Sequence, residues 1–109
     1  MKRVYIAGPM TGIEWFNRPA FYKKAKELEI AGFEAVHTAD MPLGLSYETY
    51  MSESFKRLEG CDYVLLLPGW QKSRGAKREI AFAKKYGKRI VEDLAELREF
   101  AEVTAYGRS

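Results

Sequence analysis

Short apolar runs alternate along the chain with longer stretches of helical periodicity. Val4–Ala7 is apolar and stops at a Gly-Pro pair, and Tyr63–Leu67 is almost wholly apolar. Runs of this kind, bounded by turn-forming residues, are typical of strands buried inside a parallel sheet. Two shorter runs, Phe33–Val36 and Arg89–Val91, predict a second and a fourth strand.

The stretches around these runs predict four helices, because apolar residues recur in them at spacings of three and four. Pro19 suits the first turn of one helix, and Gly32 ends it. Ser46, Ser73 and Asp93 are placed to cap the three that follow. The predicted helices span 19–31, 47–59, 74–86 and 94–100, and the tail 101–109 is predicted to fray or to lie on a partner.

Strands that alternate with helices require right-handed crossovers and a parallel sheet. The sequence therefore predicts the α/β class, with residues 1–109 as one doubly wound, flavodoxin- or Rossmann-like domain. Its mostly parallel sheet has four to five strands with helices on both faces. In such sheets, ligands bind outside the carboxyl ends of the strands, near the switch in strand order. The loops Gly8–Arg18, His37–Ser46 and Leu67–Ser73 are thus expected to carry the binding site.

Composition and charge exclude several classes of protein. The 109 residues are 47% hydrophobic and 30% charged, as in an ordinary globular domain. No apolar run approaches the ~18 residues of a membrane span. The one cysteine, Cys61, permits no intrachain disulfide, and the lack of a disulfide predicts a reducing, cytoplasmic location. The net charge of +3 is spread along the chain. Nucleic acid is therefore not an expected partner, although the field favours a small anionic ligand.

Metals and cofactors are not expected. One cysteine and one histidine, His37, cannot assemble a zinc site. The chain has neither a dinucleotide-binding glycine fingerprint nor a P-loop. His37 follows the second predicted strand, where a lone histidine is more often a polar loop residue than a catalyst. Cys61 and Asp62 precede the third strand, at the edge away from the ligand, and are predicted to be structural.

The segment Pro68–Gly75 joins a buried strand to a helix start, where free backbone N–H groups attract anions. Ser73 adds a hydroxyl and Arg74 a charge, while Gly75 lets a ligand approach the backbone closely. The same residues also describe an ordinary capped connection, and the local pattern alone favours that interpretation.

Glu79 lies one turn beyond Gly75 on the same helix face, just below any ligand held at the helix start. A carboxylate there can act as a nucleophile toward the anomeric carbon of a sugar. Glu79 is equally well explained as an early-turn glutamate paired with Arg74 or Lys77. Tyr5, inside the first strand, is either a core residue or a hydroxyl within reach of that carboxylate.

The chain carries three motifs in order: Val4–Met10, Cys61–Val64 and Ser73-x-Gly75-x-x-x-Glu79. Together they resemble the motifs of the nucleoside 2-deoxyribosyltransferase-like superfamily. Leu67–Trp70 is similar to the hallmark of a small branch of that superfamily, found often in phages and prophages. Members cleave the N-glycosidic bond of 2-deoxynucleosides or their 5′-monophosphates, and pass the sugar to another base or to water. The resemblance implies a nucleoside or nucleotide ligand, and a homodimer or larger homo-oligomer whose neighbouring subunits complete the pocket.

By the same resemblance, Glu79 is the nucleophile that attacks C1′, and Tyr5 orients its carboxylate. The other implied ligand contacts surround the sugar, its 5′ end and the base. These contacts are Gly8, Pro9, Met10, Thr11, Trp70, Ser73, Arg74 and Gly75.

One position departs from the active enzymes, which carry an aspartate eight residues before the strand-three aspartate to assist the departing base. Ser54 stands there, with Glu53 beside it, and a serine hydroxyl is no comparable acid near neutral pH. Pro9 and Thr11 also stand where phosphate-binding hydrolases carry serine and arginine. Glu53, Ser54 and His37 are therefore candidate accessory residues rather than assigned ones.

Three hypotheses follow. The first is an N-glycosidase or glycosyltransferase that acts on a (deoxy)nucleoside or nucleoside 5′-monophosphate through Glu79. The second is a catalytically silent nucleotide-binding protein, which Ser54 favours. The third is an interaction domain whose Trp15, Phe16 and Trp70 mark an interface, although the resemblance places them around a base-stacking pocket.

Overall fold

The computed structural model describes residues 2–106 as a parallel sheet covered by helices, which confirms the predicted α/β class. Four strands occur in the described residues, in the order β2-β1-β3-β4. The strand order therefore switches between β1 and β3. The strands are β1 (Arg3–Ala7), β2 (Glu34–Val36), β3 (Tyr63–Leu66) and β4 (Arg89–Val91), and the helices are α1 (Arg18–Ile30), α2 (Tyr47–Glu59), α3 (Arg74–Lys85) and α4 (Leu94–Tyr106).

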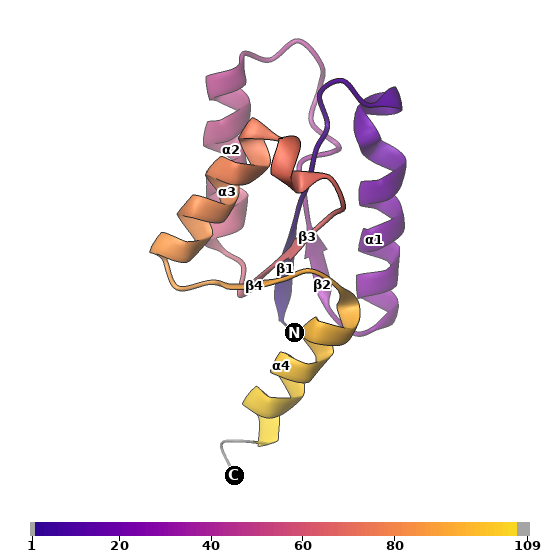
Figure 1. Ribbon diagram of the computed structural model, residues 1–109, viewed down its shortest axis with the longest axis vertical. Helices are drawn as coiled ribbons and strands as arrows, with labels where there is room; N and C mark the ends of the chain where they lie inside the picture. Colours follow the sequence, from indigo (N-terminus) through magenta and orange to yellow (C-terminus); the bar gives the residue numbers. More distant parts are fainter. Residues whose placement is uncertain (1, 107–109) are drawn as a thin grey trace.

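Alternate residues of β1 serve the two faces of the sheet. Val4 and Ile6 pack in one buried cluster with α1 and α4, whereas Tyr5 and Ala7 pack in another with α2 and α3. Figure 1 shows this layering, with α1 on one side of the sheet, α2 and α3 on the other, and α4 extending away from the lower end. The sheet thus separates two hydrophobic cores, one on each face.

The start of β2 differs from the expectation by one residue. The Phe33 N–H donates to the Leu28 carbonyl over 3.0 Å, so it closes the end of α1 instead of joining the sheet. This is the usual way in which a helix satisfies its last carbonyl groups. β2 consequently begins at Glu34.

The last helix is longer than predicted. α4 continues to Tyr106 rather than ending near Phe100, because no glycine or proline interrupts the sequence before residue 107. Residues 107–109 of the predicted tail lie outside the described residues. None of the helices in residues 2–106 is long and apolar enough to cross a membrane.

The three predicted helix caps are formed. Ser46, Ser73 and Asp93 each accept the backbone N–H three residues further on, at 3.1, 3.1 and 2.7 Å. Such caps stabilise a helix by about 1 kcal/mol each. The first helix lacks a cap of this kind, because the Asn17 side chain donates instead to the Pro9 carbonyl over 2.9 Å.

The chain enters α1 through three consecutive left-handed residues. Trp15, Phe16 and Asn17 have φ angles of 58°, 53° and 60°. This conformation costs a non-glycine residue about 1–2 kcal/mol. The surrounding contacts must therefore hold the segment in place, which fixes the direction in which α1 starts.

Cys61 and Asp62 have the structural roles that the sequence predicts. Cys61 is buried, and burial raises the pKa of its thiol to about 11, so it stays protonated near neutral pH. The Asp62 carboxylate accepts the Arg3 N–H over 3.0 Å at the start of the sheet. Neither group lies near the carboxyl ends of the strands.

Two glycines next to the ligand edge differ in how tightly they are packed. A Cβ on Gly8 would lie 2.7 Å from the Leu67 Cβ, whereas a Cβ on Gly75 would lie 3.5 Å from the Met51 sulfur, an ordinary contact. We expect Gly8→Ala to lower the free energy of unfolding by about 1–3 kcal/mol. Gly75→Ala should leave it unchanged or raise it by up to about 1 kcal/mol, through higher helix propensity. Urea denaturation of both variants checks this, and equal stabilities would contradict it.

Candidate functional site

A cavity of about 290 Å³ opens at the carboxyl edge of the sheet. Its walls come from the loop after β1, the start of α1, the loop after β2, α2 and the first turns of α3. Two of the three loops expected to carry a binding site supply these walls, and the third contributes its end, at Ser73. The volume is at the lower end of the range of about 300–1,000 Å³ for small-molecule sites.

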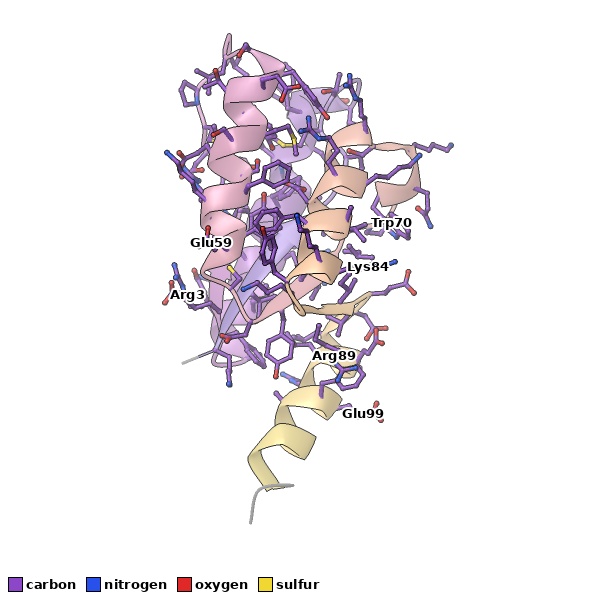
Figure 2. The ribbon with its side chains drawn as sticks, turned by 90° about the vertical axis from the view of Figure 1, so that its left-hand side faces the viewer. Arg3, Glu59, Trp70, Lys84, Arg89 and Glu99 are labelled. Atoms are coloured by element: carbon purple, nitrogen blue, oxygen red, sulfur yellow. The ribbon has the colours of Figure 1, made fainter. Side chains whose placement is uncertain are left out.

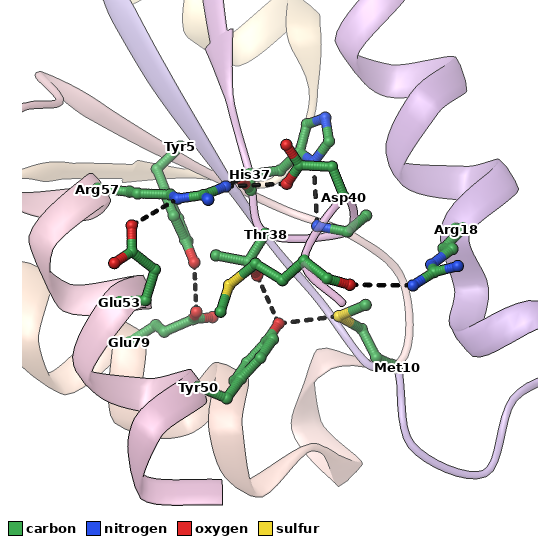
Figure 3. Close-up of polar contacts among 12 residues, drawn as sticks. Tyr5, Met10, Arg18, His37, Thr38, Asp40, Tyr50, Glu53, Arg57 and Glu79 are labelled. Carbon is green, nitrogen blue, oxygen red and sulfur yellow. Dashed lines mark hydrogen bonds and ion pairs between the residues drawn. The ribbon is translucent and has the colours of Figure 1, made fainter. Parts of the chain in front are cut away.

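Glu79 lies at the bottom of this cavity and is only 5% exposed. The Tyr5 hydroxyl, from the centre of β1, donates to Glu79 Oε2 over 2.5 Å. The second oxygen, Oε1, has no hydrogen bond to any described residue. Figure 3 shows the two side chains meeting tip to tip. Tyr5 is thus a core residue whose hydroxyl also reaches the carboxylate.

Burial raises the pKa of Glu79 to about 7, because the ionised form is poorly solvated there. The hydroxyls of Tyr5 and Ser54 oppose this rise and lower the pKa. Burial and the neighbouring carboxylate also raise the pKa of Tyr5 well above its ordinary value, so the phenol remains a donor. No ion pair joins Glu79 to Arg74 or Lys77 within residues 2–106, so the pairing alternative is not supported.

Ser54 is completely buried on α2, facing Tyr5 and Glu79. Its hydroxyl lies close enough to lower the pKa of both groups, yet it forms no hydrogen bond of normal geometry to a described residue. Glu53, the residue immediately before Ser54, points away and pairs with Arg57 over 3.1 Å. The register of α2 therefore brings the serine, and not the glutamate, to the buried carboxylate.

Tyr50 forms another part of the wall, one turn before Ser54 on α2. Its hydroxyl lies 2.5 Å from Thr38 Oγ1 and 2.9 Å from the Met10 sulfur. These contacts tie α2 to the loops after β2 and β1 (Figure 3). Burial and, to a smaller extent, the charge of Glu79 raise the pKa of the Tyr50 hydroxyl, so this hydroxyl also stays protonated.

Arg18, at the start of α1, lines the side of the cavity opposite Glu79 (Figure 3). Its Nη2 donates to the Met41 carbonyl over 3.1 Å, and its buried Nε has no partner in the described residues. A buried donor without an acceptor costs about 1–3 kcal/mol. The guanidinium is therefore an unsatisfied part of this wall.

The structure brings part of the predicted contact set to the cavity. Five of the eight predicted contacts line it, namely Gly8, Met10, Thr11, Ser73 and Gly75. Pro9 is buried, and its carbonyl accepts a hydrogen bond from the Asn17 side chain. It does not face the cavity.

Trp70, Arg74 and His37 also lie away from the cavity walls. Trp70 packs against the cluster on the α3 side of the sheet, where Figure 2 shows it on the flank of α3 away from α2. The Arg74 guanidinium stacks over the Tyr47 ring at 4.6 Å. His37 packs on α1, with its ring centroid 5.6 Å from that of Tyr22, and its Nδ1 accepts the Ala39 N–H. Burial lowers the pKa of this histidine, so it is neutral near pH 7.

Sequence analysis did not single out Arg18, Thr38 or Tyr50 as site residues. Arg18 and Thr38 lie in loops that were predicted to carry the binding site. Their location was therefore predictable, but their chemical role was not. Tyr50 lies inside the predicted helix 47–59, outside the three loops, and its hydroxyl gave no sequence signal. Within residues 2–106, no three His, Cys, Asp or Glu side chains gather in a way that suits a metal ion.

The fold is that of a doubly wound α/β protein, and its cavity lies at the switch in strand order, where such folds commonly bind ligands. Residues 2–92 match the model of a family described as a domain of unknown function, DUF4406, and the chain belongs to that family. No curated protein matches the chain in sequence. The phage-associated branch stays a prediction.

Among solved structures, the chain is similar to one described as a 2-desoxiribosyltransferase from Leishmania mexicana. The TM-score is 0.67, with 15% identity over 84% of this chain. The chain spans 63% of the length of that protein. At this identity the likeness establishes a shared fold, as the sequence motifs implied, and leaves activity to the site itself.

The raised pKa of Glu79 predicts a specific dependence of stability on pH. The folded protein holds this proton up to about pH 7, whereas the unfolded chain releases it near pH 4.5. Rising pH through this window ionises the unfolded chain first, so the group destabilises the fold increasingly up to pH 7. We expect Glu79→Gln to gain about 3 kcal/mol relative to wild type between pH 4 and pH 8. Urea denaturation at both pH values measures this, and a constant difference would contradict it.

Proposed function

We propose that this chain is an N-glycosidase or glycosyltransferase acting on a (deoxy)nucleoside or nucleoside 5′-monophosphate, with Glu79 as its nucleophile. We further propose that residues 1–109 form one domain of the nucleoside 2-deoxyribosyltransferase-like type. The observation that carries the proposal is the buried Glu79 carboxylate, held by Tyr5 at the floor of the cavity.

The hydrogen bond divides the work of the two carboxylate oxygens. Tyr5 donates to Oε2, which leaves Oε1 free to attack C1′ of a sugar seated above it. The C1′–Oε1 bond forms as the C1′–N bond breaks, and the electron pair leaves with the base. Water or a second base then displaces Glu79 from C1′. The positive charge that develops on the sugar is stabilised by the ionised carboxylate in this poorly hydrated site.

The start of α3 supports the placement of the sugar. Gly75 lines the cavity one turn before Glu79, and Ser73 lines it at the N-cap of α3. The free N–H groups of a helix start attract hydroxyl or phosphate oxygens. The 5′ end of a sugar above Glu79 falls within reach of them.

Ser54 supports the second hypothesis, a catalytically silent protein that senses or sequesters a nucleotide. A serine cannot protonate a departing base near neutral pH. Within residues 2–101, no acid other than Glu79 is buried. The same cavity then binds the ligand without cleaving it.

A panel of 2′-deoxynucleosides, ribonucleosides and their 5′-monophosphates separates the two hypotheses. We expect wild type to release free base from at least one of them, and Glu79→Gln to lose at least 10³-fold in turnover, on the order of the loss of a nucleophile. Chromatography of the free base gives the rates. Glu59→Gln, an exposed glutamate at the end of α2, is the matched control and should keep wild-type rates.

If no compound of the panel releases free base but one nucleotide raises the melting temperature, the protein binds that nucleotide without cleaving it. A ligand that binds only the folded state stabilises that state. Turnover that survives Glu79→Gln would refute the nucleophile assignment.

The Tyr5 hydrogen bond predicts the pH profile of the enzyme. Attack requires the ionised carboxylate, so kcat/KM should rise with pH and level off above about 7. Tyr5 lowers the pKa of Glu79, and Tyr5→Phe should therefore move this rise to higher pH. Tyr63→Phe removes a hydroxyl from the other core and should leave the profile unchanged. An unshifted profile in Tyr5→Phe would mean that the hydroxyl does not tune the carboxylate.

A further inference from the structure

Arg18 is a cation in the cavity wall that no acidic group neutralises. The ion pairs of the described residues involve Arg3, Lys24, Arg57 and Arg78, and none reaches Arg18. Its single hydrogen bond goes to the Met41 carbonyl. This bond holds the guanidinium in one orientation, across the cavity from Glu79 (Figure 3).

Most of the donors of this guanidinium are unused. The Nε–H is buried without a partner, and Nη1 makes no hydrogen bond to residues 2–106. A guanidinium presents its N–H groups in a planar fork that matches two neighbouring acceptor atoms. An oriented fork with free donors is a preformed site for such a pair of acceptors.

The neighbouring walls indicate which acceptors fit. Met10, Phe16 and Met41 line the same cavity with thioether and ring surface, and Met41 lies next to Arg18. A phosphate pressed against these side chains loses its hydration without replacement. A flat heteroaromatic ring is stabilised by the same surfaces, and only its polar edge needs donors.

The position of Arg18 relative to Glu79 agrees with a base at this end, and this step rests on the proposed function. With C1′ above Glu79 and the 5′ end at the start of α3, the base extends toward the remaining side of the cavity. That side is formed by the start of α1 and the loop after β2, where Arg18 and Met41 lie.

We propose that Arg18 recognises the base of the ligand by donating two hydrogen bonds to adjacent acceptors on one edge, as in a 6-oxopurine. Guanine and hypoxanthine present N7 and O6 side by side, both acceptors. Adenine presents an acceptor and an amino donor on that edge, and the donor opposes the guanidinium. The site therefore discriminates 6-oxopurine from 6-aminopurine ligands.

Binding measurements in the Glu79→Gln background test this proposal without turnover. Isothermal titration compares 2′-deoxyguanosine and 2′-deoxyadenosine, each with and without a 5′-phosphate. We expect the guanine ligands to bind about tenfold or more tightly than the adenine ligands. Arg18→Met should remove this preference by weakening the guanine ligands alone.

Two further variants make the result specific. Arg18→Lys keeps the charge and a donor for the Met41 carbonyl but not the fork, so it should lose the preference while retaining the fold. Lys23→Met removes an exposed charge from the same helix and should keep the preference.

Equal affinity for guanine and adenine ligands would overturn the proposal. So would a loss in Arg18→Met that is confined to the phosphorylated ligands, since Arg18 would then contact the phosphate. Either result leaves the proposed function in place. A failure of every nucleoside and nucleotide to bind would refute the proposed function together with this inference.

Discussion

The hydrogen bond between Tyr5 and Glu79 is the contact on which the site depends. It joins the central strand to α3 across 74 positions of sequence, inside a core that excludes water. The carboxylate would be costly to bury alone, and the phenol would be costly to bury without an acceptor. Together they satisfy one another, and the second carboxylate oxygen has no hydrogen bond to the described residues. The same burial that makes the pair expensive also moves the pKa of the acid to the middle of the physiological range.

The strand order places this pair where a ligand can reach it. Because β1 and β3 are neighbours, the loops that follow them diverge to opposite sides of the sheet and leave a hollow at its edge. α3 begins beside that hollow and presents its glycine and serine to it. α1, from the other face, contributes Arg18, and the loop after β2 closes the remaining side. The cavity is therefore lined by residues from the helices on both faces of the sheet.

Sequence periodicity was sufficient for the fold class, because the apolar patterns of the strands and the capping residues of the helices are local features of the chain. Ser46, Ser73 and Asp93 cap the helices that they were predicted to cap. The candidate site was predictable where a spaced motif lay on one element, as with Gly75 and Glu79. It was not predictable where a side chain's direction depended on tertiary packing. Trp70 and Arg74 share the motif region, yet one packs on the core and the other on a tyrosine ring.

The two-layer origin of the cavity has a consequence for how specificity can change. Arg18 is carried by the helices on one face of the sheet and Glu79 by those on the other, so their separation is set by the thickness of both cores. Interiors are close-packed, and a change of one methylene group shifts the elements that rest on it. Substitutions at buried positions such as Ile6 or Ile80 would thus re-space the two ends of the cavity. Ligand preference in such a protein can drift while every residue that touches the ligand stays the same.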